Sequence, residues 1–249
     1  MERRDRAAVA TFFCAEPLAA GRTATLDEGE TRHAHVRRIG VGDCVRLLDG
    51  TGAMAWGAVV RLTKSQGVID VERVEQVEPL PVVHLMLPIA DRDRMLLLAE
   101  KATEFGIASW RPVLWRRSRG VSPRGEGPTF QSKVRGRMIG ALTQSGGAWL
   151  PAVYPDAPLD RAIAACPPGA RWLLDAEGDP PPARPLSAPI TLAVGPEGGV
   201  ESDERATLMD AGFVPIKVAP LTLRFETAAI AGLALARAAL CPTVEEARV

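Results

Sequence analysis

The sequence predicts an α/β fold with a parallel sheet, preceded by a smaller β-rich domain. Short runs of strand-forming residues separated by glycine turns fill the chain to about Glu78. Pro79–Leu80–Pro81 then marks a boundary, because prolines do not lie inside a central strand. Beyond it, apolar runs alternate with segments of helical period over about 170 residues. We therefore divide the chain into domains at residues 1–78 and 79–249.

The first domain is expected to be a small barrel, because its strands are short and joined by Asp-Gly, Thr-Gly and Gln-Gly turns. In the second domain the near-continuous apolar run 82–87 is typical of a strand covered on both faces. The expected strands of the whole chain lie near 45–50, 55–62, 67–77, 82–87, 110–115, 171–175, 190–194 and 215–218, and the expected helices near 91–104, 130–143, 203–210 and 227–240.

The composition is that of a globular protein with a substantial core, with 47% hydrophobic and 24% charged residues and a formal net charge of zero. The four cysteines are widely scattered, so they predict reduced thiols rather than disulfides or a metal-binding CxxC pair. The basic N-terminus lacks the apolar core of a signal peptide, and no run approaches the roughly twenty apolar residues of a membrane span. We expect a soluble, cytoplasmic protein.

Basic residues are concentrated between residues 111 and 137, where Glu126 is the single acid. Such a run is often only a solvated face. Arginine forks nevertheless suit phosphate, and a protein of zero net charge does not need the cluster for solubility, so we expect contacts with a nucleic-acid backbone. The cluster comprises Arg111, Arg116, Arg117, Arg119, Arg124, Lys133, Arg135 and Arg137.

The three histidines narrow the chemistry. His33 and His35 precede the α/β domain, and His84 lies in its first expected strand. A Ser-His-Asp or Cys-His hydrolase site within that domain is therefore excluded, as are zinc and non-haem iron sites of the usual histidine type. Since His33 and His35 lie among arginines, we interpret them as surface or RNA-facing residues and predict no metal.

The segment Gly195–Gly199 follows an apolar strand and precedes a helix whose start is signalled by Ser202. Such a position is a ligand-binding location in open α/β sheets. The segment is neither GxGxxG nor a P-loop. Acidic residues in the first turn, at Glu201, Asp203 and Glu204, would repel a phosphate, whereas a cationic sulfonium suits them better. A purely structural loop is the alternative.

The residues from Thr227 to Leu240 are small or aliphatic except for Arg237 and predict a helix that is almost wholly buried. Its small side chains allow close approach by another segment or by a dimer partner. Arg224 and Glu226 lie at its entrance, and buried charges are costly unless they are paired or used.

These motifs together resemble one family. Gly195–Gly199 followed by Leu223-Arg224-x-Glu226-Thr227-Ala228 is similar to the RsmE family of SPOUT-class methyltransferases, which methylate N3 of a uridine in 16S ribosomal RNA. The further similarities span nearly the whole chain and comprise Lys101-Ala102-Thr103-Glu104 with Gly106, Gln144-Ser145-Gly146, Phe12-Phe13, and the region from His33 to Asp43.

The resemblance implies a SPOUT-type domain with a C-terminal trefoil knot, a PUA-like RNA-binding barrel before it, and a homodimer with the active site at its interface. It implies S-adenosyl-L-methionine as the cofactor and 16S ribosomal RNA or the small ribosomal subunit as partner. The implied cofactor residues are Leu174, Asp175, Val194, Gly195, Pro196, Glu197, Gly198, Gly199, Val218, Ala219, Leu221, Leu223 and Thr227. The candidate RNA-binding residues are Arg32, His33, Arg37, Arg38, Arg116, Arg117, Arg119 and Arg124.

The chain departs from the family pattern in several places. Ala219–Leu221 stands where glycine and arginine are usual, Phe225 where a smaller residue is usual, and Gly147 where arginine is common. The histidine and arginine segment before Val41 is also shorter than usual. These departures concern the target nucleotide more than the cofactor.

For the reaction we expect Arg224 to stabilise the uridine N3 anion, and Glu226 to orient it or to assist removal of the proton. The bland alternative is that Arg224 and Glu226 simply pair with each other. Three other functions remain open, namely ribose 2′-O-methylation by a related SPOUT enzyme, RNA binding without catalysis, and dinucleotide-dependent oxidation or reduction. The last is poorly supported, because the chain lacks the GxGxxG fingerprint of dinucleotide-binding domains.

Overall fold

The computed structural model describes residues 8–118, 124–182 and 187–240. By its contacts the chain divides into two compact units, residues 1–79 with 139–150, and residues 80–138 with 151–249. The first unit thus includes residues 139–150, which the sequence analysis assigns to the second domain.

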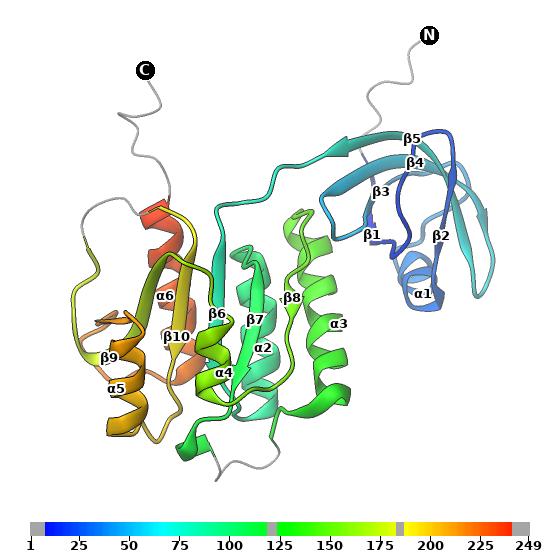
Figure 1. The fold of residues 1–249 in the computed structure, drawn as a ribbon. Coiled ribbons are helices and arrows are strands. Elements are labelled where there is room, and N and C mark those ends of the chain that lie inside the picture. Colours follow the sequence, from blue (N-terminus) through cyan, green and yellow to red (C-terminus); the bar gives the residue numbers. More distant parts are fainter. Residues whose placement is uncertain (1–7, 119–123, 183–186, 241–249) are drawn as a thin grey trace, which may run out of the picture. The chain divides into compact units, whose positions relative to one another are not determined.

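The first unit is built on a five-stranded sheet in the order β1-β3-β4-β5-β2. Only β1 and β3 pair in parallel, and the long strands β4 and β5 curl visibly (Figure 1). A Cβ on Gly57, at a bulge in β4, would lie 2.2 Å from the carbonyl oxygen of Asp70, so only glycine allows this close pairing. The strands are β1 (Thr11–Phe13), β2 (Thr23–Leu26), β3 (Cys44–Leu48), β4 (Ala53–Leu62) and β5 (Gly67–Gln76).

Helix α1 (Glu28–Val36) corrects the prediction that the first domain is entirely β. The carboxylate of Asp27 caps the helix by accepting a hydrogen bond from the backbone N–H of Glu30 at 2.8 Å. Thr31 and Ala34 are its buried residues, so no apolar period marks the helix in the sequence. The core around it contains Phe12, Val45, Leu47, Ala55, Val59, Ile69 and Val71.

The second unit contains a six-stranded sheet in the order β11-β9-β10-β6-β7-β8, and every neighbouring pair is parallel. The predicted α/β fold with a parallel sheet is therefore confirmed. The strands are β6 (Val83–Pro88), β7 (Ser109–Val113), β8 (Ala152–Val153), β9 (Ala170–Asp179), β10 (Ile190–Val194) and β11 (Val214–Ile216). The helices are α2 (Arg92–Glu104), the 3-10 turn η1 (Arg116–Ser118), α3 (Gly127–Ser145), α4 (Leu159–Ala164), α5 (Ser202–Asp210) and α6 (Phe225–Leu240).

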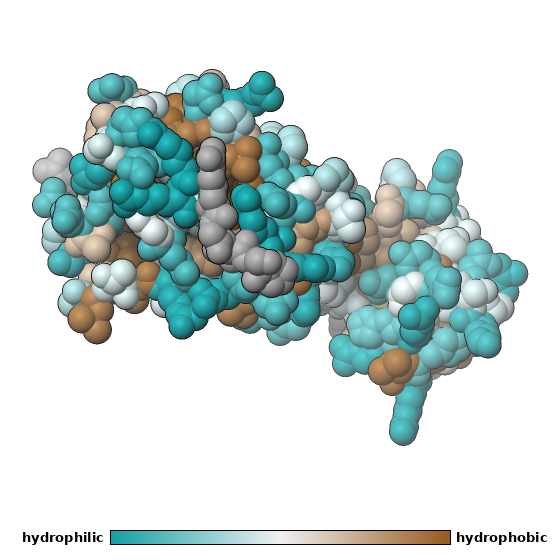
Figure 2. All heavy atoms as spheres, turned by 90° about the horizontal axis from the view of Figure 1, so that it is seen from below, coloured by the Kyte–Doolittle hydropathy of each residue, from teal (hydrophilic) through white to brown (hydrophobic). Residues whose placement is uncertain are grey.

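Helices cover both faces of this sheet. In Figure 1, α4 and α5 lie in front of it, and α2 and α6 lie behind it. Strands β7 and β10 are buried along their whole length. Burial explains the nearly continuous apolar run of β10, whereas the buried residues of β7 include Ser109 and Arg111. Strand β8 and helix α4 are not predicted from the sequence, because two and six residues are too few to show a period. On the face drawn in Figure 2, hydrophilic side chains predominate and hydrophobic ones form small groups.

Candidate active site

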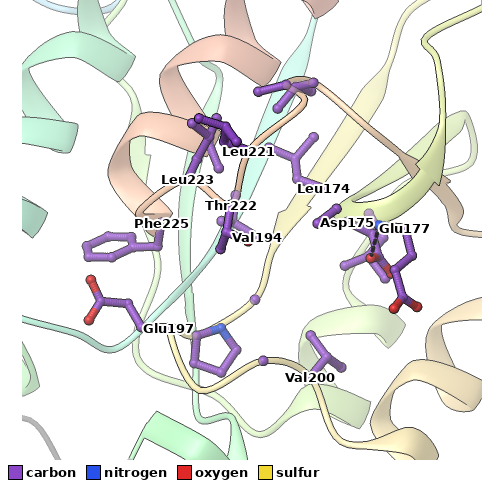
Figure 3. A pocket seen from close by; sticks show the side chains of 18 of the residues that line it. Leu174, Asp175, Glu177, Val194, Glu197, Val200, Leu221, Thr222, Leu223 and Phe225 are labelled. Atoms are coloured by element: carbon purple, nitrogen blue, oxygen red, sulfur yellow. Dashed lines mark hydrogen bonds between the residues drawn. The ribbon is translucent and has the colours of Figure 1, made fainter.

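A cavity of about 410 Å³ opens at the carboxyl ends of β9 and β10, within the size range of small-ligand pockets. Three segments enclose it, namely the end of β9, the glycine loop after β10, and the segment before α6 (Figure 3). Ligands of open parallel sheets bind at this edge, because the loops that follow the strands converge there. Of the residues predicted for the cofactor, those in its wall are Leu174, Asp175, Val194, Gly195, Pro196, Glu197, Gly199, Val218, Ala219, Leu221 and Leu223.

Two of the predicted cofactor residues lie outside the wall. The carbonyl of Gly198 accepts a hydrogen bond from Arg117 at 2.8 Å, and a Cβ on Gly198 would lie 3.1 Å from Cβ of that arginine. Thr227 is exposed on α6, and Phe225 and Ala228 line the cavity there instead. The helical turn at the start of α6 decides which of its side chains face the cavity.

The glycine loop needs glycine at two positions. Gly199 has φ of +78°, a conformation that side chains disfavour, and its N–H donates to the carbonyl of Pro196 at 2.8 Å. A Cβ on Gly195 would lie 2.6 Å from Cγ2 of Val200, which lines the cavity. The loop therefore brings its backbone close to the cavity.

The start of α5 is more fully occupied than the sequence suggests. Glu201 and Glu204 form a capping box, so they satisfy N–H groups at this helix end. Glu204 is 6% exposed and also accepts a hydrogen bond from the backbone N–H of Arg116 at 3.0 Å. The internal caps, rather than free negative charge, make this end a poor phosphate site.

The other acids of this turn are paired with η1. Arg117 binds both carboxylate oxygens of Glu201, at 2.7 and 3.0 Å. Arg116 pairs with Asp203, and this hydrogen bond holds the pKa of the Asp203 carboxyl below its usual value. The expectation that free acids at this helix end repel a phosphate is therefore wrong. These acids are paired with arginines, because η1 packs against the start of α5.

The wall of the cavity carries three carboxylates, those of Asp175, Glu177 and Glu197, and one guanidinium, that of Arg205. Nε of Arg205 donates to Oδ2 of Asp175 at 3.0 Å, and Nη2 of Arg205 lies 2.9 Å from the same oxygen. Glu197 pairs with Arg94 of α2, whose side chain is outside the wall. The carboxylates of the wall thus outnumber its guanidinium by two, and Glu177 is the one that has no ion pair within the described residues, so it is the carboxylate most available to a cationic ligand.

The two predicted catalytic residues differ in environment. Arg224 is exposed, and within the described part of the chain its guanidinium has no hydrogen-bond or ion-pair partner. Glu226 is 7% exposed, and its Oε1 lies 4.0 Å from Nε of Arg94. The alternative that Arg224 and Glu226 simply pair with each other is therefore wrong, because the packing of α2 on α6 brings Arg94 to Glu226.

The predicted RNA-binding residues of the second unit are mostly engaged in ion pairs. Besides Arg116 and Arg117, Arg124 lies 3.2 Å from Glu126. Arg119 lies outside the described residues. Arg111, counted in the basic cluster, is 7% exposed and donates to the carbonyl of Ala165, so it is a core residue rather than part of a basic surface.

The predicted RNA-binding residues of the first unit lie on and after α1. Arg32 is exposed and pairs with Glu28. Arg37 and Arg38 are exposed beyond the end of the helix. His33 is half-buried, and its ring packs edge-on against Phe12 with centroids 5.5 Å apart. The arginines are thus accessible, whereas His33 has a packing role.

Several residues at the site are not predicted from the sequence. Arg94 has no local signal, because an arginine in an amphipathic helix is typical of a solvated face. Glu177, Val200 and Arg205 could have been found from the rule that ligands meet the carboxyl edge of a parallel sheet. No group of three or more metal-ligating side chains occurs among the described residues, and no helix within that part of the chain is long and apolar enough to cross a membrane.

Comparisons with known proteins agree with this geometry. A family described as RNA methyltransferase domain matches residues 77–237. Proteins of Mycobacterium bovis and Mycobacterium tuberculosis named ribosomal RNA small subunit methyltransferase E are each 31% identical over 238 residues, which is 90% of this chain and 90% of theirs.

Solved structures share the fold. A ribosomal RNA small subunit methyltransferase E of Neisseria gonorrhoeae, bound to S-adenosyl methionine, superposes with a TM-score of 0.81 at 25% identity, over 91% of this chain and 96% of that one. A Legionella pneumophila protein in complex with the bound cofactor SAM has a TM-score of 0.82 at 23% identity, over 94% of this chain and 98% of that one. At this identity the likeness supports the fold and not the function. With its family match and its relatives covering nine-tenths of its length, the chain belongs to the RNA methyltransferase family of the small subunit methyltransferases E, the RsmE family.

Proposed function

We propose that this protein binds S-adenosyl-L-methionine in the cavity and transfers its methyl group to N3 of a uridine in 16S ribosomal RNA. The observation that carries the proposal is the cavity itself. Three segments far apart in the sequence, around Asp175, Gly195 and Leu221, enclose one acidic cavity in a chain of the RNA methyltransferase family. The N. gonorrhoeae relative of the same fold is bound to S-adenosyl methionine.

The residues present fit such a ligand. Asp175, Glu177 and Glu197 complement a molecule that carries a sulfonium and an ammonium group. Leu174, Leu223 and the backbone of Gly195 offer an apolar, close-fitting surface for the planar adenine. Bound there, S-adenosyl-L-methionine would supply an electrophilic methyl group and leave as a neutral thioether.

The chain's own residues would prepare the uridine. N3 of uracil bears a weakly acidic proton, so it becomes nucleophilic only when that proton is removed. Arg224 and Glu226 flank Phe225, which lines the cavity. We assign proton removal to the buried carboxylate of Glu226 and stabilisation of the developing N3 anion to the exposed guanidinium of Arg224.

The remaining assignments concern the assembly. We propose that residues 1–78 form a PUA-like RNA-binding domain and residues 79–249 a SPOUT domain with a trefoil knot. The meeting of segments 174–177, 194–200 and 218–223 at one cavity supports such a knot. We further propose a homodimer that acts in the cytoplasm, where ribosomal subunits are available, with Gly198 and Thr227 near the cofactor.

Contact with RNA is assigned to arginines that are exposed or, in the case of Arg124, partly exposed. Arg32, Arg37 and Arg38 are accessible on the first unit, and Arg116, Arg117 and Arg124 could exchange their carboxylate partners for phosphates. Arg119 and His33 complete the predicted set. Replacing Arg37 and Arg38 by alanine should weaken RNA binding and reduce the slope of log K against log salt by about two. An unchanged slope would remove these arginines from the interface.

The test is methyl transfer from labelled S-adenosyl-L-methionine to small ribosomal subunits, with the modified nucleotide mapped. Label at N3 of a uridine supports the proposal, and label at a ribose 2′-oxygen refutes the N3 assignment. We expect Glu226→Gln to lower kcat by about 100-fold or more while the Kd of the cofactor changes little. Asp210→Asn, an exposed carboxylate at the far end of α5, is the matched control. A Glu226→Gln protein with normal kcat would rule out the carboxylate as base.

A further inference from the structure

The carboxylate of Glu226 has two unlike oxygens. Oε1 lies 4.0 Å from Nε of Arg94. Oε2 is buried and has no hydrogen-bond partner within the described residues. The side chain as a whole is only 10% exposed. A buried carboxylate oxygen without a donor is costly, so its presence in a folded protein calls for an explanation, of which a catalytic role is one.

Arg94 is held on both sides. Its backbone N–H donates to the capping carboxylate of Asp91 at 3.1 Å, in the first turn of α2. Its guanidinium pairs through Nη1 with Glu197 of the glycine loop, and its side chain is 31% exposed. Because α2 packs against α6, this arginine links the glycine loop to the first turn of α6.

We propose that Arg94 is a positioning residue for the methyl transfer, an inference that rests on the function proposed above. The guanidinium of Arg94 lies beside Oε1 of Glu226 and holds the side chain in place, which leaves Oε2 as the unused acceptor. An imide N–H such as that of uridine N3 is the donor which that oxygen lacks. The proton would then pass from N3 to Oε2, and the freed electron pair of N3 would bond the methyl carbon as the bond from that carbon to the sulfonium sulfur breaks.

The same geometry explains why Arg94, rather than Arg224, has this role. Arg224 is exposed and forms no ion pair with Glu226, whose carboxylate lies beside Arg94 instead. A charge partner in water is strongly screened, whereas a partly buried one at 4.0 Å is not. The two arginines therefore divide the work, with Arg94 acting on the base and Arg224 on the substrate.

The experiment compares wild type, Arg94→Ala, Arg94→Lys and Arg94→Gln, alone and combined with Glu226→Gln. Methyl transfer to small subunits gives kcat at saturating cofactor, and calorimetry gives the Kd of S-adenosyl-L-methionine. We expect Arg94→Ala to lower kcat about 10- to 100-fold, with a smaller change in KM for the RNA. Arg94→Lys should recover part of this loss. In the Glu226→Gln background Arg94→Ala should cost less than about threefold, because the two residues act as one unit.

Arg92→Ala is the matched control. Arg92 is on the same turn of α2, lies 6.0 Å from the ring centroid of Phe130, and has no ion-pair partner in the described part of the chain. We expect wild-type kcat from it. If Arg94→Ala does not fold, Arg94→Gln keeps the aliphatic stem and takes its place. A normal kcat for Arg94→Ala or Arg94→Gln, or an equal loss in both backgrounds, overturns the positioning role alone. No methyl transfer by wild type overturns the proposed function and this role together.

Discussion

Replacing Arg237 by alanine should destabilise the second unit, because this side chain joins α6 to two other backbone segments, at Pro81 and at Phe105–Gly106. Its guanidinium, in the last turn of α6, donates to the carbonyl of Phe105 at 2.6 Å and to those of Gly106 and Pro81. Phe105 is the C-cap of α2 and Gly106 follows it, at a helix end where carbonyls have no partner within the helix. A cation at this end also complements the helix dipole.

The magnitude follows from these three hydrogen bonds. Each bond to a charged group contributes about 1.5–3 kcal/mol when taken alone. The three share one half-buried side chain and are not additive, so we expect a total loss of about 2–4 kcal/mol in the free energy of unfolding. Arg237→Lys presents a single charged centre in place of the fork and should recover about a third of that loss.

Urea denaturation followed by circular dichroism measures this change. We expect a lower midpoint with an unchanged m-value, since the buried surface is the same. Lys133→Ala, which removes an exposed basic residue from α3, is the control and should stay within about 0.5 kcal/mol of wild type. If Arg237→Ala also stayed within about 0.5 kcal/mol, the three carbonyl contacts would not stabilise the fold as we infer.

Three further predictions concern the core and the cavity. Gly232→Ala places a Cβ 2.7 Å from Cδ1 of Leu174, which lines the cavity. The cost of overpacking, about 1–3 kcal/mol, should exceed the gain in helix propensity of about 1 kcal/mol. Calorimetry should therefore show weaker cofactor binding, and an affinity equal to wild type would contradict this. Burial, and then the charge of Arg111, lower the pKa of His84 to about 4, so the stability that its neutral ring contributes is present above pH 6.5 and lost as the pH falls toward 4. The shift corresponds to at most about 3.4 kcal/mol, and for a half-buried ring we expect about 1–2 kcal/mol. Urea titrations of wild type and His84→Asn should diverge over this pH range, and parallel curves would refute the prediction. Arg117→Ala removes an exposed ion pair and should cost less than about 1 kcal/mol of stability while it releases the carbonyl of Gly198 and raises the cofactor Kd; an unchanged Kd would mean that the loop holds its shape without the arginine.

The sequence determined the parts of this protein that depend on local pattern. Apolar runs such as 82–87 and 190–194 predicted buried parallel strands, and both were found as β6 and β10. Because parallel strands present their carboxyl ends at one edge, the loops after β9 and β10 had to approach each other, so Asp175 and Gly195 meet at one cavity. Helix α1 escaped prediction, because a polar helix with two buried residues has no apolar stripe.

Only the tertiary structure decided which charges meet. Glu226 pairs with Arg94 rather than with its sequence neighbour Arg224, and Arg117 binds Glu201 rather than lying free for RNA. Such pairs depend on how α2 packs on α6 and how η1 packs on α5. A periodicity in the chain specifies which face of a helix is buried, but not which residue of another element lies opposite. For this reason the cavity was foreseeable from the sequence, whereas the partner of its buried carboxylate was not.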